Sequence, residues 1–283
     1  NVLVDNGVLE KRRGIGMFVT DGAPEALKAR RRADFHADFI TPFLAEGARL
    51  GLSLDDIIDL AEAKARGIAV CNIRNYAKHT VPEHTFALML ALRRSVLPYR
   101  QSVIEGRWQQ AAQFCYFDYP IADLGGSTLG VIGHGTLGQS VGKIAEAFGM
   151  TVLAAGRRGA TELKPGQTAF DEVLKSSDVI TLHCPLTPET RGVIGVREFA
   201  LMERKPLLIN TGRGGLVDEL ALEKALDAGQ ISGAGFDVTD GEPPAADSPM
   251  MRIASRENVI LTPHVAWASR EAIQEIGRAS CRE

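Results

Sequence analysis

The chain has 283 residues, of which 45% are hydrophobic and 24% charged, as expected for a globular protein of two modest domains. The formal net charge of −3 gives no reason to expect a nucleic-acid partner, and no apolar run approaches the roughly 20 residues of a membrane span. The four cysteines are scattered without a CxxC pair. We therefore expect no metal site, no membrane contact, and reduced thiols in a cytoplasmic protein.

The sequence pattern predicts secondary structure only after the first fifty-five residues. Residues 1–55 show no clear alternation of strands and helices. Beyond them we expect a helix over 56–67 and a buried strand over 68–71. An apolar helix is expected over 81–97 and a second helix over 99–108.

Strands and helices then alternate strictly as far as residue 261. The expected strands are 128–132, 151–155, 179–183, 207–210, 233–237 and 259–261. The expected helices are 136–148, 170–176, 197–202 and 219–228. Short β-rich runs separated by helices predict an α/β fold with a Rossmann-type, doubly wound parallel sheet.

A glycine-rich turn follows the strand over 128–132. It reads Gly133-His134-Gly135-Thr136-Leu137-Gly138, which is the G-x-G-x-x-G pattern between a strand and a helix. Gly133 allows the tight turn, Gly135 lets a pyrophosphate approach the backbone, and Gly138 lets the helix pack close to the strand. The free N–H groups at the start of the helix also favour phosphate. This context predicts a dinucleotide site rather than a purely structural glycine turn.

The end of the next strand bears on the choice of cofactor. NAD-type sites usually carry Asp or Glu there, which bonds the ribose hydroxyls. Here Gly156 takes that place and is followed by Arg157 and Arg158. We interpret the two arginines as a clamp for a 2′-phosphate, so that NAD(P) binds with NADPH preferred. The alternative is that both are ordinary surface arginines.

Three polar side chains lie at or just beyond expected strand ends, where open α/β sheets bind ligands. Arg213 can hold a substrate carboxylate with two hydrogen bonds and polarise the neighbouring carbonyl. His264 can give a proton to the carbonyl oxygen as hydride reaches the carbon, and Glu242 can orient the imidazole. Singly, these residues are explained as a loop charge, a turn residue and a core histidine. Together, after a dinucleotide loop, they predict reduction of a 2-keto acid.

Between residues 56 and 275 the chain resembles the D-isomer-specific 2-hydroxyacid dehydrogenases, and most of all the hydroxypyruvate reductases (glycerate dehydrogenases). The matching segments are 75–85, 133–138, 182–187, 210–214, 237–243 and 263–264. The resemblance implies Arg213, Glu242 and His264 as catalytic residues. Beyond the glycines it implies cofactor contacts from Thr136, Leu137, Pro185, Thr187, Thr211 and Asp237, the last near the nicotinamide amide. It also implies a homodimer to which residues 81–119 contribute.

The resemblance implies a dinucleotide-binding domain over 75–264 and a split substrate domain formed by 1–74 and 265–283. The substrate-domain parts fit the family poorly, since the loop expected to bind the substrate carboxylate reads Gly47 to Asp55 without the family pattern. Residues 276–283 can be encoded by a common sequencing adapter, which we interpret as an artefact. We therefore expect an incomplete substrate domain and poor turnover.

The sequence thus predicts an oxidoreductase that moves a hydride between a nicotinamide cofactor and a small D-2-hydroxy acid or its keto acid, hydroxypyruvate or glyoxylate. A phosphoglycerate dehydrogenase is an alternative within the family. A nucleotide-sensing co-repressor of the same fold is a non-enzymatic alternative, and such proteins keep the same Arg, Glu and His. Formate dehydrogenase is disfavoured because those enzymes carry Gln where Glu242 stands.

Overall fold

The computed structural model describes residues 9–12, 16–19, 66–67, 73 and 75–279. The chain divides into two compact units, residues 1–72 and residues 73–283. In the first unit, β1 (Leu9–Arg12) and β2 (Gly16–Val19) pair antiparallel. Sequence analysis did not predict this pair. The helix and strand expected over 56–71 lie outside the described residues, apart from a turn at 66–67.

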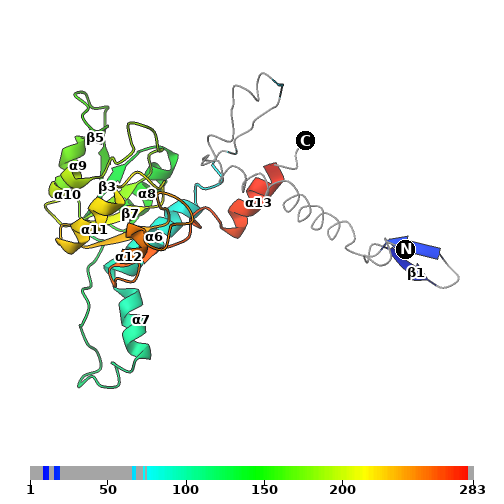
Figure 1. Ribbon diagram of the computed structural model, residues 1–283, viewed down its shortest axis with the longest axis horizontal. Coiled ribbons are helices and arrows are strands. Elements are labelled where there is room, and N and C mark those ends of the chain that lie inside the picture. The colour runs from blue at the N-terminus through cyan, green and yellow to red at the C-terminus, as the bar shows by residue number, and fades with distance from the viewer. Residues whose placement is uncertain (1–8, 13–15, 20–65, 68–72, 74, 280–283) are drawn as a thin grey trace. The chain divides into compact units, whose positions relative to one another are not determined.

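The second unit is built on a parallel sheet of seven strands in the order β5-β4-β3-β6-β7-β8-β9 (Figure 1). The strands are β3 (Thr128–Ile132), β4 (Thr151–Ala155), β5 (Gln167–Thr168), β6 (Val179–Leu182), β7 (Leu207–Asn210), β8 (Gly233–Phe236) and β9 (Val259–Leu261). The strand order reverses between β3 and β6, which creates the switch point where open α/β sheets bind ligands. The predicted doubly wound parallel sheet is confirmed.

Helices cover both faces of this sheet. One face is packed by α6 (Thr80–Arg93) and α8 (Thr136–Ala147). The other is packed by α9 (Phe170–Ser176), α10 (Val196–Ala200), α11 (Glu219–Asp227) and α12 (Pro249–Ile253). Successive strand residues alternate between the two cores, so that Leu207 and Ile209 join the first and Leu208 joins the second.

The apolar helix expected over 81–97 is shorter than predicted. It ends at Arg93, and α7 (Val96–Ile104) begins after Ser95, whose backbone is left-handed with a φ of 47°. The Ser95 hydroxyl donates to the carbonyl of Pro120 at 2.6 Å, so a returning segment fixes the break. Periodicity did not reveal it because the residues on both sides suit a helix. Figure 1 shows α7 projecting away from the sheet.

Three other elements were missed by the sequence analysis. Strand β5 has two residues and helix α12 has five, which is too short for a hydrophobic period to show. The third is α13 (Arg270–Ala279). In the described part of the chain, every helix is too short or too polar to cross a membrane.

Candidate active site

The glycine-rich turn lies between β3 and α8, at the switch point of the sheet. Gly133 has a φ of 93°, and a Cβ there would lie 2.3 Å from the backbone nitrogen of Cys184. A Cβ on Gly138 would lie 2.2 Å from the Gly133 carbonyl oxygen, whereas one on Gly135 would meet no atom within 4 Å. Packing within the protein therefore requires Gly133 and Gly138, while Gly135 borders open space.

This open space has the donors that a pyrophosphate needs. Helix α8 begins after Gly135 without a side-chain cap, so the N–H groups of its first turn are available to an anion. Thr136 is exposed and Leu137 half-buried beside them. The sequence placed the cofactor phosphates here, and the geometry of the turn fits that group.

The segment after β6 lies against the glycine turn. Thr190 fixes it, because its hydroxyl accepts from the Thr187 N–H at 2.7 Å and donates to the Pro185 carbonyl at 2.7 Å. His183 precedes this turn, and its Nε2 lies 2.9 Å from the hydroxyl of Thr181. Burial lowers the pKa of His183 to about 4. This imidazole is therefore neutral near pH 7 and is not the proton donor.

The two arginines predicted to clamp a 2′-phosphate differ in their contacts. Arg158 forms an ion pair with the buried carboxylate of Glu198 at 3.1 Å and donates to the Gly192 carbonyl at 3.4 Å. Arg157 is exposed, and its side chain makes no hydrogen bond or ion pair with any other described residue. The pKa of Glu189 is lowered chiefly by a hydrogen bond from Thr187 and to a smaller extent by the charge of Arg157. Of these two arginines, only Arg157 thus has a guanidinium without a hydrogen bond or ion pair to another described residue.

Arg213 lies in the loop after β7, and Asn210 shapes that loop. The buried Asn210 amide donates to the Arg213 carbonyl at 2.9 Å and accepts from the Gly212 N–H at 3.0 Å. The Arg213 side chain is exposed, and one Nη donates to the Gly212 carbonyl at 2.9 Å. A fixed backbone therefore presents a guanidinium that retains donors for a carboxylate.

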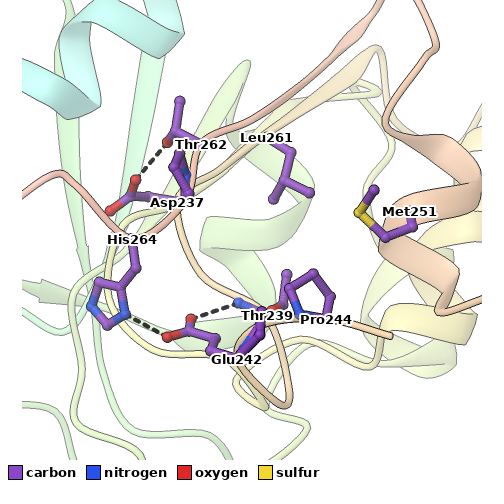
Figure 2. Close-up of a pocket in the computed structure, with 10 residues that line it drawn as sticks. Asp237, Thr239, Glu242, Pro244, Met251, Leu261, Thr262 and His264 are labelled. Atoms are coloured by element: carbon purple, nitrogen blue, oxygen red, sulfur yellow. Dashed lines mark hydrogen bonds and ion pairs between the residues drawn. The ribbon is translucent and has the colours of Figure 1, made fainter. Parts of the chain in front are cut away.

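The predicted acid–base pair is in contact. Nδ1 of His264 lies 2.5 Å from Oε2 of Glu242 (Figure 2). The other carboxylate oxygen of Glu242 accepts from the Thr239 N–H at 3.0 Å. Among the described residues, none bonds Nε2 of His264, and the side chain is 38% exposed. The carboxylate thus fixes the imidazole from one side and leaves the other nitrogen open to a substrate.

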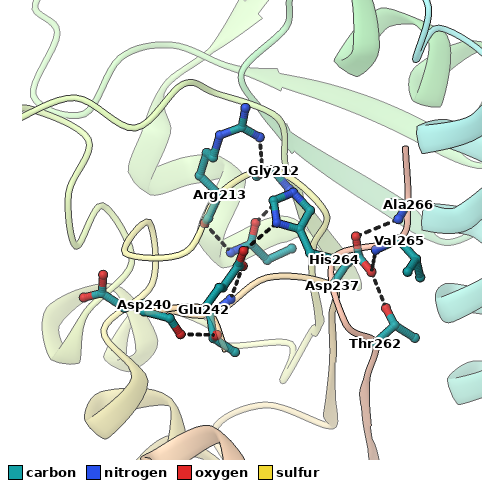
Figure 3. A network of polar contacts seen from close by, with 12 residues as sticks. Gly212, Arg213, Asp237, Asp240, Glu242, Thr262, His264, Val265 and Ala266 are labelled. Carbon is teal, nitrogen blue, oxygen red and sulfur yellow. Dashed lines mark hydrogen bonds and ion pairs between the residues drawn. The ribbon is translucent and has the colours of Figure 1, made fainter. Parts of the chain in front are cut away.

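The loop of Arg213 and the loop of Glu242 touch. A Cβ on Gly214 would lie 1.8 Å from the Thr239 carbonyl oxygen, so only glycine permits this approach. Figure 3 shows the Arg213 loop beside the His264–Glu242 pair. The structure therefore brings together the three residues that the sequence predicted as catalytic.

The backbone of His264 is unusual and is held by Asp237. His264 has a φ of 53°, a left-handed conformation that costs about 1–2 kcal/mol in a non-glycine residue. The Asp237 carbonyl accepts from the His264 N–H at 2.8 Å. Its fully buried carboxylate accepts from the Val265 and Ala266 N–H groups at 2.9 and 2.8 Å (Figure 3). Sequence reasoning assigned Asp237 only to the cofactor and missed this anchoring of the histidine turn.

Helix α6 fixes the same loops from the other side. Thr85 bonds the Thr211 hydroxyl at 2.8 Å, and Thr80 donates to the Ala266 carbonyl at 2.9 Å. His84 lies between them, with Nε2 3.0 Å from the hydroxyl of Thr262. The Thr262 hydroxyl in turn donates to the Asp237 carboxylate, so Nε2 of His84 must carry the hydrogen of the first bond. One helix therefore sets the positions of the loops after β7 and β9.

A cavity of about 460 Å³ opens beside the acid–base pair (Figure 2). The pair forms one wall and apolar side chains form much of the remainder. The lining residues are Asp237, Thr239, Glu242, Pro243, Pro244, Met251, Leu261, Thr262, Pro263 and His264. Across the described residues, no group of His, Cys, Asp and Glu is placed to hold a metal ion.

Comparison with known proteins identifies the class. The family model for the NAD-binding domain of D-isomer-specific 2-hydroxyacid dehydrogenases matches residues 86–266. The chain belongs to this family of nicotinamide-dependent oxidoreductases, and the family predicted from the sequence is confirmed.

Individual relatives share much of the chain. It is 55% identical over 221 residues to glycerate dehydrogenase of Methylorubrum extorquens, covering 77% of this chain and 68% of that protein. It is 40% identical over 220 residues to hydroxypyruvate reductase of Blautia hydrogenotrophica, covering 77% and 67%. Among solved structures, D-lactate dehydrogenase from Aquifex aeolicus complexed with NAD and lactic acid has a TM-score of 0.68 and 35% identity, covering 80% of this chain and 71% of that one.

Proposed function

We propose that the protein reduces a small 2-keto acid, hydroxypyruvate or glyoxylate, to the corresponding D-2-hydroxy acid. The observation that carries this proposal is the 2.5 Å contact between His264 and Glu242, in loops adjoining that of Arg213. The similarity to glycerate dehydrogenase and hydroxypyruvate reductase supports the choice of substrate.

In this proposal each side chain has a defined task. A bound nicotinamide cofactor supplies the hydride for the carbonyl carbon. Arg213 binds the substrate carboxylate through its free donors and polarises the carbonyl. His264 gives the proton on Nε2 to the carbonyl oxygen, and Glu242 stabilises the orientation and charge of the imidazole. The keto acid thereby gains one hydride and one proton.

The cofactor would lie along the carboxyl edge of the sheet. The turn from Gly133 to Gly138 would hold the pyrophosphate, and residues Pro185, Thr187, Thr211 and Asp237 would line the remaining path to the catalytic group. Arg157 would bind the 2′-phosphate of NADPH, because its guanidinium is exposed and uncommitted. We expect NADPH to be preferred over NADH for this reason.

We further propose a homodimer in a reducing compartment such as the cytoplasm. Helix α7 and the loop after it expose large apolar side chains, among them Phe114 at 88% and Phe117 at 79%. A second copy of the chain would cover them. The free thiols of Cys115 and Cys184 suit a reducing environment. Sedimentation of the wild type and of Phe114→Asp/Phe117→Asp tests the dimer, which the double substitution should dissociate.

Turnover measurements test the catalytic proposal. NADPH and NADH oxidation should be followed with hydroxypyruvate, glyoxylate and pyruvate, and NAD(P) reduction with 3-phosphoglycerate. We expect hydroxypyruvate or glyoxylate to give the highest kcat/KM. His264→Ala should lower kcat at least about a hundredfold, as expected for loss of a general acid. His79→Ala removes an exposed histidine and serves as the matched control.

Two results would contradict the proposal. Nucleotide binding with no turnover at all of these acids, as distinct from the poor turnover expected of an incomplete substrate domain, would favour the co-repressor alternative. A His264→Ala variant as active as His79→Ala would remove His264 from the mechanism.

A further inference from the structure

Glu198, on α10, is a buried carboxylate that accepts two hydrogen bonds and forms an ion pair with Arg158. Its residue is only 2% exposed. One oxygen accepts from the Gly195 N–H at 3.1 Å. The other lies 3.1 Å from a guanidinium nitrogen of Arg158 and 3.1 Å from one of Arg197. A charge buried to this degree is stable only when it is paired, so the loss of these contacts would cost free energy.

The charges around Glu198 balance locally. Arg197 also forms two hydrogen bonds with the carboxylate of Asp171, at 2.5 and 3.1 Å. Two guanidinium groups, those of Arg158 and Arg197, thus face two carboxylates. The adjacent Arg157 takes no part in this cluster. Of the two consecutive arginines after β4, one is committed to α10 and the other is available to an anion.

We infer that Glu198 is a positioning residue that determines cofactor specificity. Its carboxylate holds Arg158 against α10, so that a 2′-phosphate is bound by Arg157 alone. Discrimination between NADPH and NADH is then smaller than two arginines would give. The inference rests on the proposed function, in which the adenosine ribose lies at the end of β4.

The inference predicts that removing the charge of Glu198 strengthens phosphate binding. Glu198→Gln keeps an oxygen for the Gly195 N–H and weakens the hold on Arg158. The released guanidinium then gives a 2′-phosphate a second charge-assisted hydrogen-bonding partner. We expect the preference for the phosphate to rise roughly tenfold, the size of one such interaction.

Calorimetric titration of the full chain with 2′,5′-ADP and 5′-AMP tests this prediction, because the two probes differ only in the 2′-phosphate. The readout is the ratio of their Kd values, which a merely structural defect would leave unchanged. Arg157→Ala should lower the preference for 2′,5′-ADP about tenfold, and Arg158→Ala should change it less than about twofold. Glu198→Gln should raise it, and the gain should vanish in Glu198→Gln/Arg158→Ala.

A matched control is Glu223→Gln, which weakens the 2.6 Å ion pair between Glu223 on α11 and Arg252 on α12. It should leave the ratio unchanged. If Glu198→Gln does not fold, as judged by its thermal transition, the Arg158→Ala result alone decides the matter. An Arg158→Ala effect as large as that of Arg157→Ala would overturn the inference, because Arg158 would then already bind the phosphate.

Two further outcomes are informative. A gain that persists in the double variant would show that Glu198 acts by repulsion alone, which also overturns the inference. If neither arginine affects the ratio while both probes bind, the end of β4 does not bind the 2′-phosphate. That outcome removes the NADPH proposal together with this inference, whereas the keto-acid assays on His264 still decide the catalytic proposal.

Discussion

The half-buried imidazole of His183 should make the stability of the nucleotide-binding unit depend on pH. Its Nε2 bonds Thr181, and among the described residues no group accepts from its buried Nδ1. Protonation would place an N–H without an acceptor in a buried site, in addition to the cost of a buried charge. Burial accordingly lowers the pKa of His183 to about 4.

The direction and size of the effect follow from this pKa. An unfolded histidine titrates near pH 6.5, so between pH 6.5 and 4 the unfolded chain binds a proton that the folded chain does not. The contribution to stability is therefore complete above about pH 6.5 and is lost as the pH falls toward 4. At pH 5 the loss relative to pH 7 is about 2 kcal/mol.

Urea unfolding of the wild type and of His183→Gln, at pH 7 and at pH 5, measures this contribution. Glutamine is neutral throughout and can keep a bond to Thr181. The difference in free energy of unfolding between wild type and variant should shrink by about 2 kcal/mol on going to pH 5. His79→Gln, at an exposed position, controls for the loss of an ordinary histidine. Parallel pH dependence of the wild type and His183→Gln would refute the reasoning.

Three further predictions concern the nucleotide turn and the catalytic loops. Gly135→Ala should keep the wild-type melting temperature and weaken NAD(P)H binding, because its Cβ meets no protein atom but enters the proposed pyrophosphate site. Gly133→Ala should weaken binding and also lower the melting temperature, because its Cβ would lie 2.3 Å from Cys184. Equal melting temperatures of the two variants would contradict this. Asp237→Asn should lower the free energy of unfolding, measured in urea, by about 1.5–3 kcal/mol, because one hydrogen bond from a backbone N–H to a charged acceptor is lost. A loss below about 0.5 kcal/mol would contradict the anchoring role of Asp237. Arg213→Ala should raise KM for the keto acid at least about tenfold without changing the Kd of the nucleotide, since the lost interactions are with the keto acid and not with the nucleotide.

Several strands were predictable because they are short apolar runs closed by turn residues. The bounds expected for the strands over 128–132, 151–155, 207–210 and 259–261 agree with β3, β4, β7 and β9. Strand β7 is buried throughout and β3 is buried beyond its first residue, so hydrophobicity alone marks them, whereas β4 and β9 are only partly buried. The break at Ser95 was not predictable, because it depends on a hydrogen bond to Pro120 that only the folded chain makes.

The candidate site, too, was predictable from the sequence only in part. The order of the glycines and the residues at strand ends indicated where Arg213, Glu242 and His264 lie, because parallel strands end at one edge of a sheet. The ion pair between Arg158 and Glu198 was not predictable, since its partners come from the end of β4 and from α10. Two adjacent arginines cannot be distinguished from the sequence, and only the packing of α10 shows that Arg158 is held in an ion pair.

The strand order also shows how far one ligand must extend to contact both the glycine turn and the catalytic loops. The glycine turn follows β3 and the arginines follow β4, while Arg213, Glu242 and His264 come after β7, β8 and β9. Neighbouring strands are about 4.8 Å apart, so β3 and β9, four positions apart, are separated by roughly 19 Å along the sheet edge. A ligand bound at the glycine turn must therefore be extended to reach His264, as a dinucleotide is. Changes at the β4 end should then alter nucleotide affinity alone, and changes at the β7–β9 end should alter the reaction of the keto acid alone. Substitutions at Arg157 that changed kcat for a saturating cofactor would show that the two ends are not independent.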